Sequence, residues 1–281
     1  MQICRTIAEM RTWVTDCRAR GERIALVPTM GFLHDGHMTL IRRAREIGDR
    51  VVVWIFVNPT QFENSTDLAA YPRNTERDLE MLRGENVDAA FLPEAAEIYP
   101  EGSETIVETT KMANMLHGKL RPGHFRGVTT VVTKFFNIIQ PDAAMFGEKD
   151  YQQLQIIRRM VRDLHMPIEI VGVPTVREPD GLAMSSRNVR LTAEDRAAAV
   201  VLSQALGLAD KLTAQGTTVQ ALYEAITAKI AAEPRAALKG LDIVAAETLK
   251  EISGPLAGPA AIMLSVKFGE VLLIDQRVVT P

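Results

Sequence analysis

Short apolar runs that alternate with helix-like segments constrain the fold of this chain more than any other feature. Residues 24–27 and 51–57 are continuous apolar runs, and residues 40–47 between them have the mixed pattern of an amphipathic helix that ends near Gly48. A strand, a crossover helix and a second strand in this order predict two parallel neighbours. Because the runs are continuous rather than alternating, both faces of the sheet should be covered. The pattern predicts a Rossmann-like, doubly wound α/β fold.

The alternation continues through the first two-thirds of the chain and then changes. Further helices are predicted at residues 75–83, 128–139 and 151–164, and further strands at 88–92, 143–146 and 168–173. After Arg187, Thr192 with Asp195 three residues later indicates a helix N-terminus. Helices are then expected at 196–212 and 219–232, and strands at 242–246, 261–266 and 271–274, with a hairpin at 267–270. We predict two domains, residues 1–176 and a smaller α+β lid domain of residues 177–281, which meet in the loop 174–188.

Charge and cysteine content argue against several classes of function. The 281 residues carry 32 basic and 35 acidic side chains, a net charge of −3, so no global basic field predicts binding to nucleic acid or to an anionic membrane. Uninterrupted apolar runs are shorter than the roughly 20 residues of a spanning helix. The only two cysteines, Cys4 and Cys17, have no CxxC spacing, which argues against a disulfide scaffold and favours a cytoplasmic location.

The strongest local feature is the loop after the first predicted strand. Residues 28–37 read Pro-Thr-Met-Gly-Phe-Leu-His-Asp-Gly-His, with two of the five histidines three residues apart. Ligands of open α/β sheets bind at the carboxyl ends of strands, and a helix that begins there favours an anion. Gly31 and Gly36 permit close backbone approach, and an imidazole N–H can donate to a phosphate oxygen. We interpret the loop as an anion site; the alternatives are helix-capping histidines and a metal-binding pair.

Three later segments are also candidates, and each has a plain structural alternative. Residues 58–62, Asn-Pro-Thr-Gln-Phe, are either a pair of ligand-binding amides or an ordinary turn. Residues 147–153 place Lys149 beside a second helix N-terminus, or carry a helix cap with an exposed lysine. Residues 180–188, which include Arg187 and several hydroxyl groups, form a binding loop or a linker. No GxxxxGK[ST] or GxGxxG motif occurs, so these loops would have to replace a P-loop.

Taken together, the segments resemble the pantoate–β-alanine ligase family, in the nucleotidyltransferase superfamily that carries a HIGH-type motif. His34-Asp35-Gly36-His37 stands at the HIGH position, and Met184-Ser185-Ser186-Arg187-Asn188 stands at the position of the KMSKS-type loop. The resemblance also rests on the segments 56–62, 71–73, 121–127 and 146–154. Many adenylyl-transferring enzymes share a HIGH-like motif, whereas its combination with Asn-Pro-Thr-Gln-Phe and Gly-Glu-Lys-Asp-Tyr-Gln-Gln points to this one family.

The resemblance implies a two-step ligation that uses ATP. The carboxylate of (R)-pantoate attacks the α-phosphate of ATP, which gives an enzyme-bound pantoyl adenylate and pyrophosphate. The amine of β-alanine then attacks the acyl carbon, which releases pantothenate and AMP. Such a reaction depends on in-line positioning and on stabilisation of the spreading negative charge. Exclusion of water would protect the acyl adenylate from hydrolysis.

The resemblance also implies roles for residues of this sequence. The implied catalytic residues are His34, His37, Lys149, Ser185, Ser186 and Arg187. The implied ATP-binding residues are Met30, Gly31, Phe32, Leu33, His34, Asp35, Gly36, His37, Gly147, Glu148, Lys149, Asp150, Val176, Met184, Ser185, Ser186 and Arg187. The implied binding residues for pantoate and β-alanine are Asn58, Gln61, Arg121, His124 and Gln153.

Magnesium and a second copy of the chain are the further expected partners. Mg²⁺ should arrive with ATP, and Asp78 is the carboxylate that matches an expected ligand after the Tyr-Pro-Arg segment. The resemblance implies a homodimer. Three hypotheses compete with the ligase: another nucleotidyltransferase of the HIGH superfamily, a metal-dependent hydrolase that uses His34 and His37, and a nucleotide-binding module without catalysis. Release of AMP that requires both pantoate and β-alanine would separate the ligase from all three.

Overall fold

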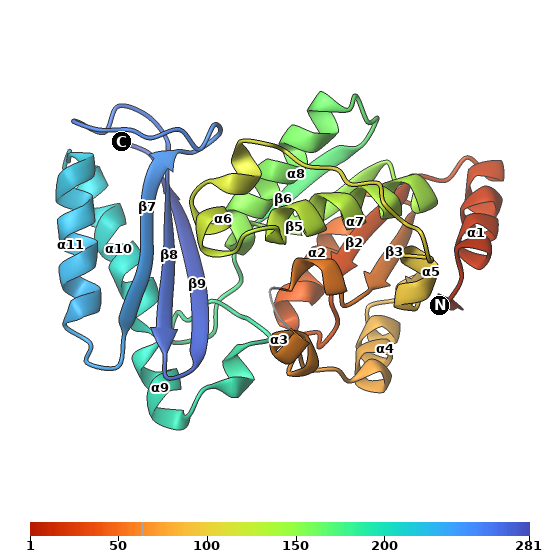
Figure 1. Ribbon diagram of the computed structural model, residues 1–281, viewed down its shortest axis with the longest axis horizontal. Helices are drawn as coiled ribbons and strands as arrows, with labels where there is room; N and C mark the ends of the chain where they lie inside the picture. Colours follow the sequence, from red (N-terminus) through yellow and green to blue (C-terminus); the bar gives the residue numbers. More distant parts are fainter. Residues whose placement is uncertain (63–64) are drawn as a thin grey trace. The chain divides into compact units, whose positions relative to one another are not determined.

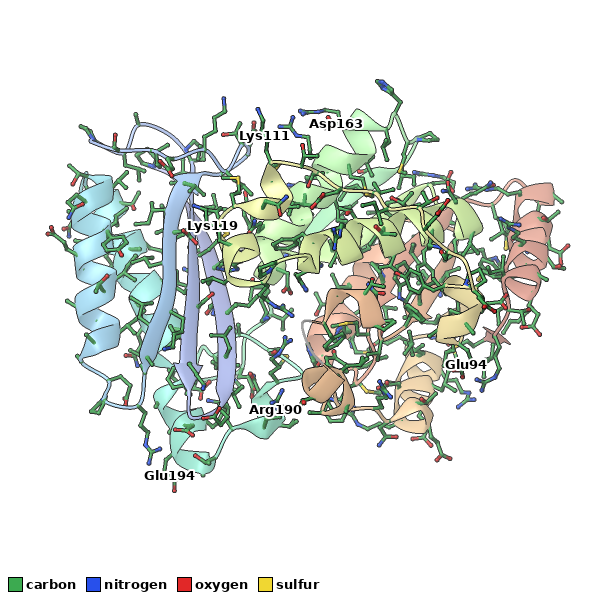
Figure 2. All side chains as sticks on the ribbon, viewed as in Figure 1. Glu94, Lys111, Lys119, Asp163, Arg190 and Glu194 are labelled. Atoms are coloured by element: carbon green, nitrogen blue, oxygen red, sulfur yellow. The ribbon has the colours of Figure 1, made fainter. Side chains whose placement is uncertain are left out.

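The computed structural model describes residues 1–62 and 65–281, which form two compact units (Figure 1). The first unit contains Met1–Gly147 and Ile156–Val173, and the second contains Glu148–Gln155 and Pro174–Pro281. Charged side chains such as those labelled in Figure 2, namely Glu94, Lys111, Lys119, Asp163, Arg190 and Glu194, are exposed. Each unit has a hydrophobic core of its own.

A six-stranded parallel sheet is the frame of the first unit. Its strands are β1 (Gln2–Cys4), β2 (Ile24–Thr29), β3 (Arg50–Ile55), β4 (Ala89–Phe91), β5 (Ala143–Gly147) and β6 (Glu169–Val173). Their order in the sheet is β1-β4-β3-β2-β5-β6. The chain proceeds from β2 outward to β3 and β4 and then returns to pair β5 with the other edge of β2. This reversal confirms the predicted doubly wound fold, and ligands of such folds bind outside the carboxyl ends of the strands at the reversal.

Helices cover both faces of this sheet, which explains why its strands are apolar on both sides. The helices that lie in or enter this unit are α1 (Ile7–Ala19), α2 (Asp35–Ile47), α3 (Ser65–Ala69), α4 (Thr75–Gly84), α5 (Ala95–Ile98), α6 (His117–Leu120), α7 (His124–Ile139), α8 (Tyr151–Asp163), and the 3₁₀ helices η1 (Pro59–Gln61) and η2 (Met112–Asn114). On one face, Ile41 of α2 and Leu82 of α4 are buried in a core with Val53. On the other face, Phe135 of α7 contacts Phe91 of β4 edge to face, with 5.6 Å between ring centroids.

A three-stranded antiparallel sheet with two long helices beside it forms most of the second unit (Figure 1). The strands β7 (Ala237–Ala245), β8 (Ala260–Phe268) and β9 (Val271–Val279) lie in chain order. The helices are α9 (Ala193–Ala198), α10 (Val201–Ala214) and α11 (Val219–Ala231), with the 3₁₀ helices η3 (Glu148–Asp150) and η4 (Asn188–Arg190). Leu206 of α10 and Ile226 of α11 share a core with Ile262 of β8. This confirms the predicted α+β architecture.

Several predicted elements differ from the observed ones at their ends or in number. The predicted helix 196–212 is two helices, α9 and α10, and neither β1 nor α1 was predicted from the sequence. The hairpin is confirmed, since Phe268 pairs with Val271 across a turn that contains Gly269 at φ +54°. The stretch 193–214 has the length and apolar composition of a spanning helix, a test that the core helix of a soluble protein also passes. Its Leu202 and Leu206 are buried in the core of the second unit.

Candidate active site

A buried carboxylate holds the loop between β2 and α2. Asp78 of α4 is only 1% exposed. Its Oδ2 accepts a hydrogen bond from the backbone N–H of Phe32, and its Oδ1 accepts one from the backbone N–H of Leu33, both at 2.8 Å. The side chain of Thr29, at the end of β2, accepts a further bond from the N–H of Gly31 at 3.2 Å. The loop backbone is therefore fixed at the carboxyl end of β2.

The backbone of this loop is strained at Phe32. Phe32 has φ +50° and Gly31 has φ +79°, both in the left-handed region. A Cβ at Gly31 would lie 3.0 Å from Asp78 Oδ2 and 3.1 Å from Ile55 Cγ2, so only glycine fits. A left-handed non-glycine residue costs about 1–3 kcal/mol and persists where surrounding contacts enforce it. Here the bonds to Asp78 enforce it, and Arg77 donates to the carbonyl of Leu33 at 2.9 Å.

The two histidines lie together at the N-terminus of α2. The backbone N–H of His34, the N-cap residue, donates to Nδ1 of His37 at 3.2 Å, and the ring centroids are 4.1 Å apart. Because Nδ1 of His37 accepts this bond, a neutral His37 carries its proton on Nε2. The helix N-terminus favours negative charge at the same place. The arrangement can bind an oxyanion with backbone N–H groups and imidazole donors.

Asn58 organises the segment after β3. It is 1% exposed, and its amide nitrogen donates to Gln61 Oε1 at 3.1 Å and to the carbonyl of Gly127 at 3.2 Å. Its amide oxygen accepts from the hydroxyl of Tyr99 at 2.9 Å. Burial raises the pKa of Tyr99, which keeps this hydroxyl a donor at neutral pH. These bonds favour a supporting role for Asn58 rather than direct contact with a substrate.

Gln61 connects this segment with the histidine loop. It is 9% exposed, and its amide nitrogen donates to the thioether sulfur of Met30 at 3.1 Å. A thioether is a weak acceptor, so a ligand oxygen could replace it at little cost. Nδ1 of His124, at the start of α7, lies 2.8 Å from the carbonyl oxygen of Gln61. The structure thus brings together Met30, Gln61 and His124 from three separate segments of the chain.

In the second unit, Lys149 and the hydroxyl-rich loop share a small cavity. Lys149 lies in η3, which packs against β9, and its side chain is 16% exposed. Ser185, Asn188 and Asp275 line the same cavity, which is too narrow to admit a water molecule. The amide nitrogen of Asn188 donates to the carbonyl of Ala183 at 3.1 Å, whereas its Oδ1 is buried without a hydrogen-bond partner in the part of the chain that the structure describes. Because the cavity has no room for a water, a ligand or a water reaches this acceptor only when the loop moves.

A buried ion pair holds the base of the hydroxyl-rich loop. Arg177 Nη1 and Nη2 donate to the two carboxylate oxygens of Asp275, at 2.7 and 2.9 Å, and Arg177 Nη1 also donates to the carbonyl of Gly181 at 3.0 Å. Asp275 is 1% exposed. Further along the loop, the N–H of Met184 donates to the carbonyl of Val176 at 2.9 Å. The loop base is therefore fixed to β9.

The predicted site residues fall into two groups, one in each unit. The first unit holds Met30, Gly31, Phe32, Leu33, His34, Asp35, Gly36, His37, Asn58, Gln61, Asp78, Arg121, His124 and Gly147. The second holds Glu148, Lys149, Asp150, Gln153, Val176, Met184, Ser185, Ser186 and Arg187. No role was predicted for Arg177 or Asp275, which lie 98 positions apart and belong to no local motif.

The arrangement of Asp78 does not fit a metal ligand. Both of its oxygens are engaged by backbone N–H groups, and it is almost completely buried. Among residues 1–62 and 65–281, no group of three or more histidines, cysteines, aspartates or glutamates is arranged to hold a metal ion. Asp78 is therefore better described as the residue that positions the loop.

Comparison with known proteins gives one consistent result. A family model described as pantoate-beta-alanine ligase matches residues 2–278. A pantothenate synthetase of Agrobacterium fabrum is 49% identical over 99% of this chain and 96% of its own, and one of Heliobacterium modesticaldum is 50% identical over 99% of both. The crystal structure of pantothenate synthetase from Thermus thermophilus is 44% identical, with a TM-score of 0.95 over the whole of both chains. A pantoate-beta-alanine ligase of Francisella tularensis, complexed with beta-gamma ATP and beta-alanine, is 35% identical over 99% of this chain and 97% of its own, with a TM-score of 0.82.

Proposed function

The chain belongs to the pantoate–beta-alanine ligase family, whose activity is the ATP-dependent condensation of pantoate with β-alanine, and we propose which of its residues carry out each part of that reaction. In the first step, a pantoate carboxylate oxygen bonds to the α-phosphorus of ATP, and the bond from that phosphorus to the bridging oxygen breaks as pyrophosphate leaves. In the second step, the β-alanine nitrogen bonds to the acyl carbon, loses a proton, and AMP leaves.

The observation that carries the proposal is the fixed histidine loop at the strand reversal. The N-terminus of α2 and the Nε2–H of His37 supply donors for phosphate oxygens, and the Asp78 bonds fix the backbone next to them. Donors that are already in place cost no reorganisation when charge spreads over the phosphate. The attacking carboxylate has no proton to lose. We therefore assign His37 and His34 an electrostatic role.

The second unit supplies further donors. Lys149 and Ser185 line one cavity, and Ser186 and Arg187 follow in the same loop. We assign them to the phosphates of ATP, with Val176 and Met184 near the adenine. Gln61, Gln153, Arg121 and His124 are assigned to pantoate and β-alanine, supported for Gln61 by its weak, replaceable bond to Met30.

Three further features complete the proposal. Mg²⁺ would bind through the phosphate oxygens that ATP brings and would neutralise part of their charge. The free, buried Cys4 and Cys17 agree with a reducing cytoplasm. We also propose a homodimer, and two domains with the boundary between residues 176 and 177, a division that leaves Glu148–Gln155 and residues 174–176 in the first domain although they pack with the second unit.

Separate assays of the two half-reactions test these assignments. Pantoate should support exchange of pyrophosphate into ATP without β-alanine, and release of AMP with pantothenate should require both. His37→Ala and Lys149→Ala should each slow the exchange by about 100-fold or more, the scale for loss of one oxyanion donor. Glu80→Gln, an exposed change on α4, is the control. Near-normal exchange in either variant removes that residue from the catalytic set, and AMP release without β-alanine counts against the ligase.

A further inference from the structure

A cavity lined by arginines lies at the amino ends of the strands of the parallel sheet, opposite the carboxyl ends that carry the histidine loop. Its volume is about 390 Å³, and Trp13, Arg20, Arg50, Arg83, Asn86 and Asp88 line it. Arg50 is the first residue of β3 and Asp88 directly precedes β4, so this arginine cavity is at the amino ends of the strands. The six residues of β3 span about 20 Å between the amino and carboxyl ends of the sheet. The arginine cavity is thus distinct from the candidate active site.

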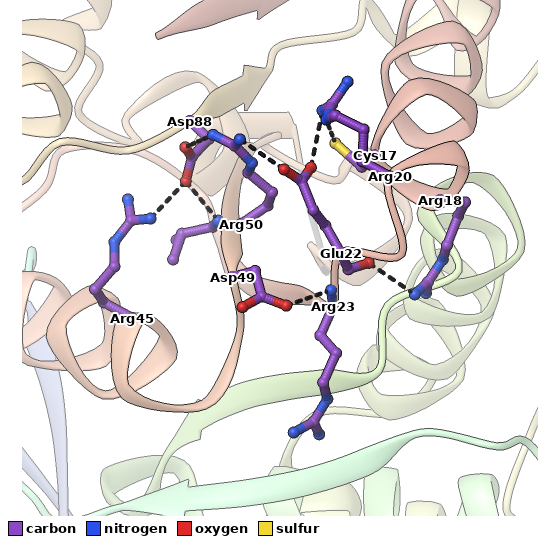
Figure 3. Close-up of polar contacts among 10 residues, drawn as sticks. Cys17, Arg18, Arg20, Glu22, Arg23, Arg45, Asp49, Arg50 and Asp88 are labelled. Carbon is purple, nitrogen blue, oxygen red and sulfur yellow. Dashed lines mark hydrogen bonds and ion pairs between the residues drawn. The ribbon is translucent and has the colours of Figure 1, made fainter.

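An alternating network of charges fixes two of these arginines (Figure 3). Glu22 accepts from Arg20 at 2.8 Å and from Arg50 at 2.7 Å. Asp88 accepts from Arg50 at 2.9 Å and from Arg45 at 2.7 Å. Hydrogen bonds, first from Arg50 and then from Arg20, lower the pKa of Glu22 to about 2, so Glu22 stays charged at any physiological pH. The network contains three arginines, Arg20, Arg45 and Arg50, and two carboxylates, so its net charge is positive.

The network leaves donors available at the cavity. Among the residues that the structure describes, Arg20 donates only through Nη2, to Cys17 and Glu22, and its side chain is 51% exposed. Arg83 is exposed and makes no ion pair with any residue that the structure describes. The lining itself has three arginines and one aspartate, which leaves two positive charges. Guanidinium groups that are held in place lose little freedom when they bind an anion.

We propose that the arginine cavity binds a small molecule through a phosphate or diphosphate group. The planar guanidinium fork matches the spacing of phosphate oxygens and donates two bonds to them. The volume falls in the range of small-ligand sites. Trp13 and Val87 also line the cavity but are almost completely buried, so its accessible surface is mainly polar. Two sources share this chemistry: pyrophosphate released by the ligase reaction, and a phosphorylated metabolite.

Trp13 provides a local reporter that does not depend on catalysis. The chain has two tryptophans, Trp13 and Trp54, so their two indole N–H resonances in the ¹⁵N-labelled protein can be assigned with Trp13→Phe. Pyrophosphate, inorganic phosphate and AMP are titrated separately, with sodium chloride adjusted to hold the ionic strength constant because screening alone alters exposed charges. We expect a saturable shift of the Trp13 resonance with at least one of them. A response to pyrophosphate alone assigns the diphosphate group as the ligand, and a response to AMP assigns a single phosphate carried by an organic part.

Matched variants decide whether the arginines cause the shift. The double variant Arg20→Gln/Arg83→Gln should weaken the binding about tenfold or more, because it removes two charge-assisted donors. Arg11→Gln, an exposed change on the same helix as Trp13, should bind as the unchanged protein does. The absence of a saturable Trp13 shift, an equal shift with chloride alone, or equal affinity in the double variant would each overturn the proposal.

Discussion

Two buried aspartates each hold one loop that carries predicted site residues, but with different partners. Asp78 in the first unit and Asp275 in the second are both 1% exposed. Asp78 accepts from the backbone N–H groups of Phe32 and Leu33, whereas Asp275 accepts from the guanidinium of Arg177. The first loop is thus held through its own backbone, and the second through one side chain at its base.

This difference predicts unequal freedom in the two loops. The bonds to Asp78 fix the backbone directly before His34, the N-cap of α2. In the second loop the ion pair fixes Arg177, while at the tip Ser185 accepts from the N–H of Arg187 within the loop itself. We expect the first loop to be rigid before ATP binds and the tip of the second to adjust to the ligand, as lids of other enzymes do.

Asp78→Ala should produce the largest effect. It leaves two backbone N–H groups without an acceptor, and the left-handed Phe32 loses the contacts that enforce it. The free energy of unfolding should fall by about 2–6 kcal/mol, since each unsatisfied buried group costs about 1–3 kcal/mol. Pyrophosphate exchange should slow by about 100-fold, the scale expected when catalytic groups move by about 1 Å. Denaturant unfolding and the exchange assay measure the two effects.

Asp78→Asn gives the graded control for this prediction. Its amide keeps one acceptor oxygen, so one of the two N–H bonds survives and the losses should be intermediate. Glu80→Gln on the same helix should change neither quantity. Wild-type stability and exchange in Asp78→Ala would show that the loop needs no external support, which would break the contrast between the two aspartates.

Asp275→Ala should have a smaller effect on catalysis than Asp78→Ala, and a second substitution should restore the stability that it loses. Loss of one member of a buried pair leaves Arg177 uncompensated and costs about 3–5 kcal/mol. Replacement of both members by apolar residues, as in Arg177→Met/Asp275→Leu, should recover most of that stability, because the charge that lacked a partner is gone. No second substitution can rescue Asp78→Ala in this way, since the partners of Asp78 are backbone groups.

The exchange assay separates positioning from stability in this second loop. In the double variant the fold is stable but the loop base is no longer tied to β9, so exchange should stay slower by about tenfold while stability returns. Glu270→Gln, an exposed change in the same hairpin, is the control. If exchange recovers together with stability, the ion pair serves the fold alone.

The sequence predicted most of the fold where local patterns decide it. Continuous apolar strands, and the cap at Thr192, which accepts from the N–H of Asp195 at 3.1 Å, appear as expected. Helix α1 was missed although its capping box, Thr6 with Glu9, was readable. Strand β9 was predicted to end at residue 274 because polar residues follow, yet Asp275 is buried since its partner Arg177 arrives from elsewhere in the chain.

The candidate site was predictable in position and less so in the function of its parts. The motif placed His34 and His37 at the N-terminus of α2, which the structure confirms. The resemblance also gave Asp78 as the expected magnesium ligand, but no pattern indicated that both of its oxygens would accept from a backbone turn. Such partners depend on the angle between a helix and a loop far apart in sequence, and periodicity carries no information on that angle.

The smallest expected effect is a change of stability at acidic pH, and it arises from Asp180 at the base of the second loop. A hydrogen bond from Arg196 lowers the pKa of Asp180 below its usual 3.8, and the N–H of Leu182 also donates to Asp180 at 3.2 Å. A carboxyl whose pKa falls on folding stabilises the fold above its unfolded pKa and loses that contribution as the pH falls through the folded value. The melting temperature of Asp180→Asn should therefore lie slightly below that of the unchanged protein at neutral pH, by an amount that corresponds to at most about 1 kcal/mol for so exposed a pair. The gap should close as the pH drops below 3.8, measured by circular dichroism at matched ionic strength. If the difference in melting temperature persists below pH 3.8, the charge of Asp180 does not hold the loop base. The second loop would then be held mainly by hydrogen bonds to its backbone, as the first loop is.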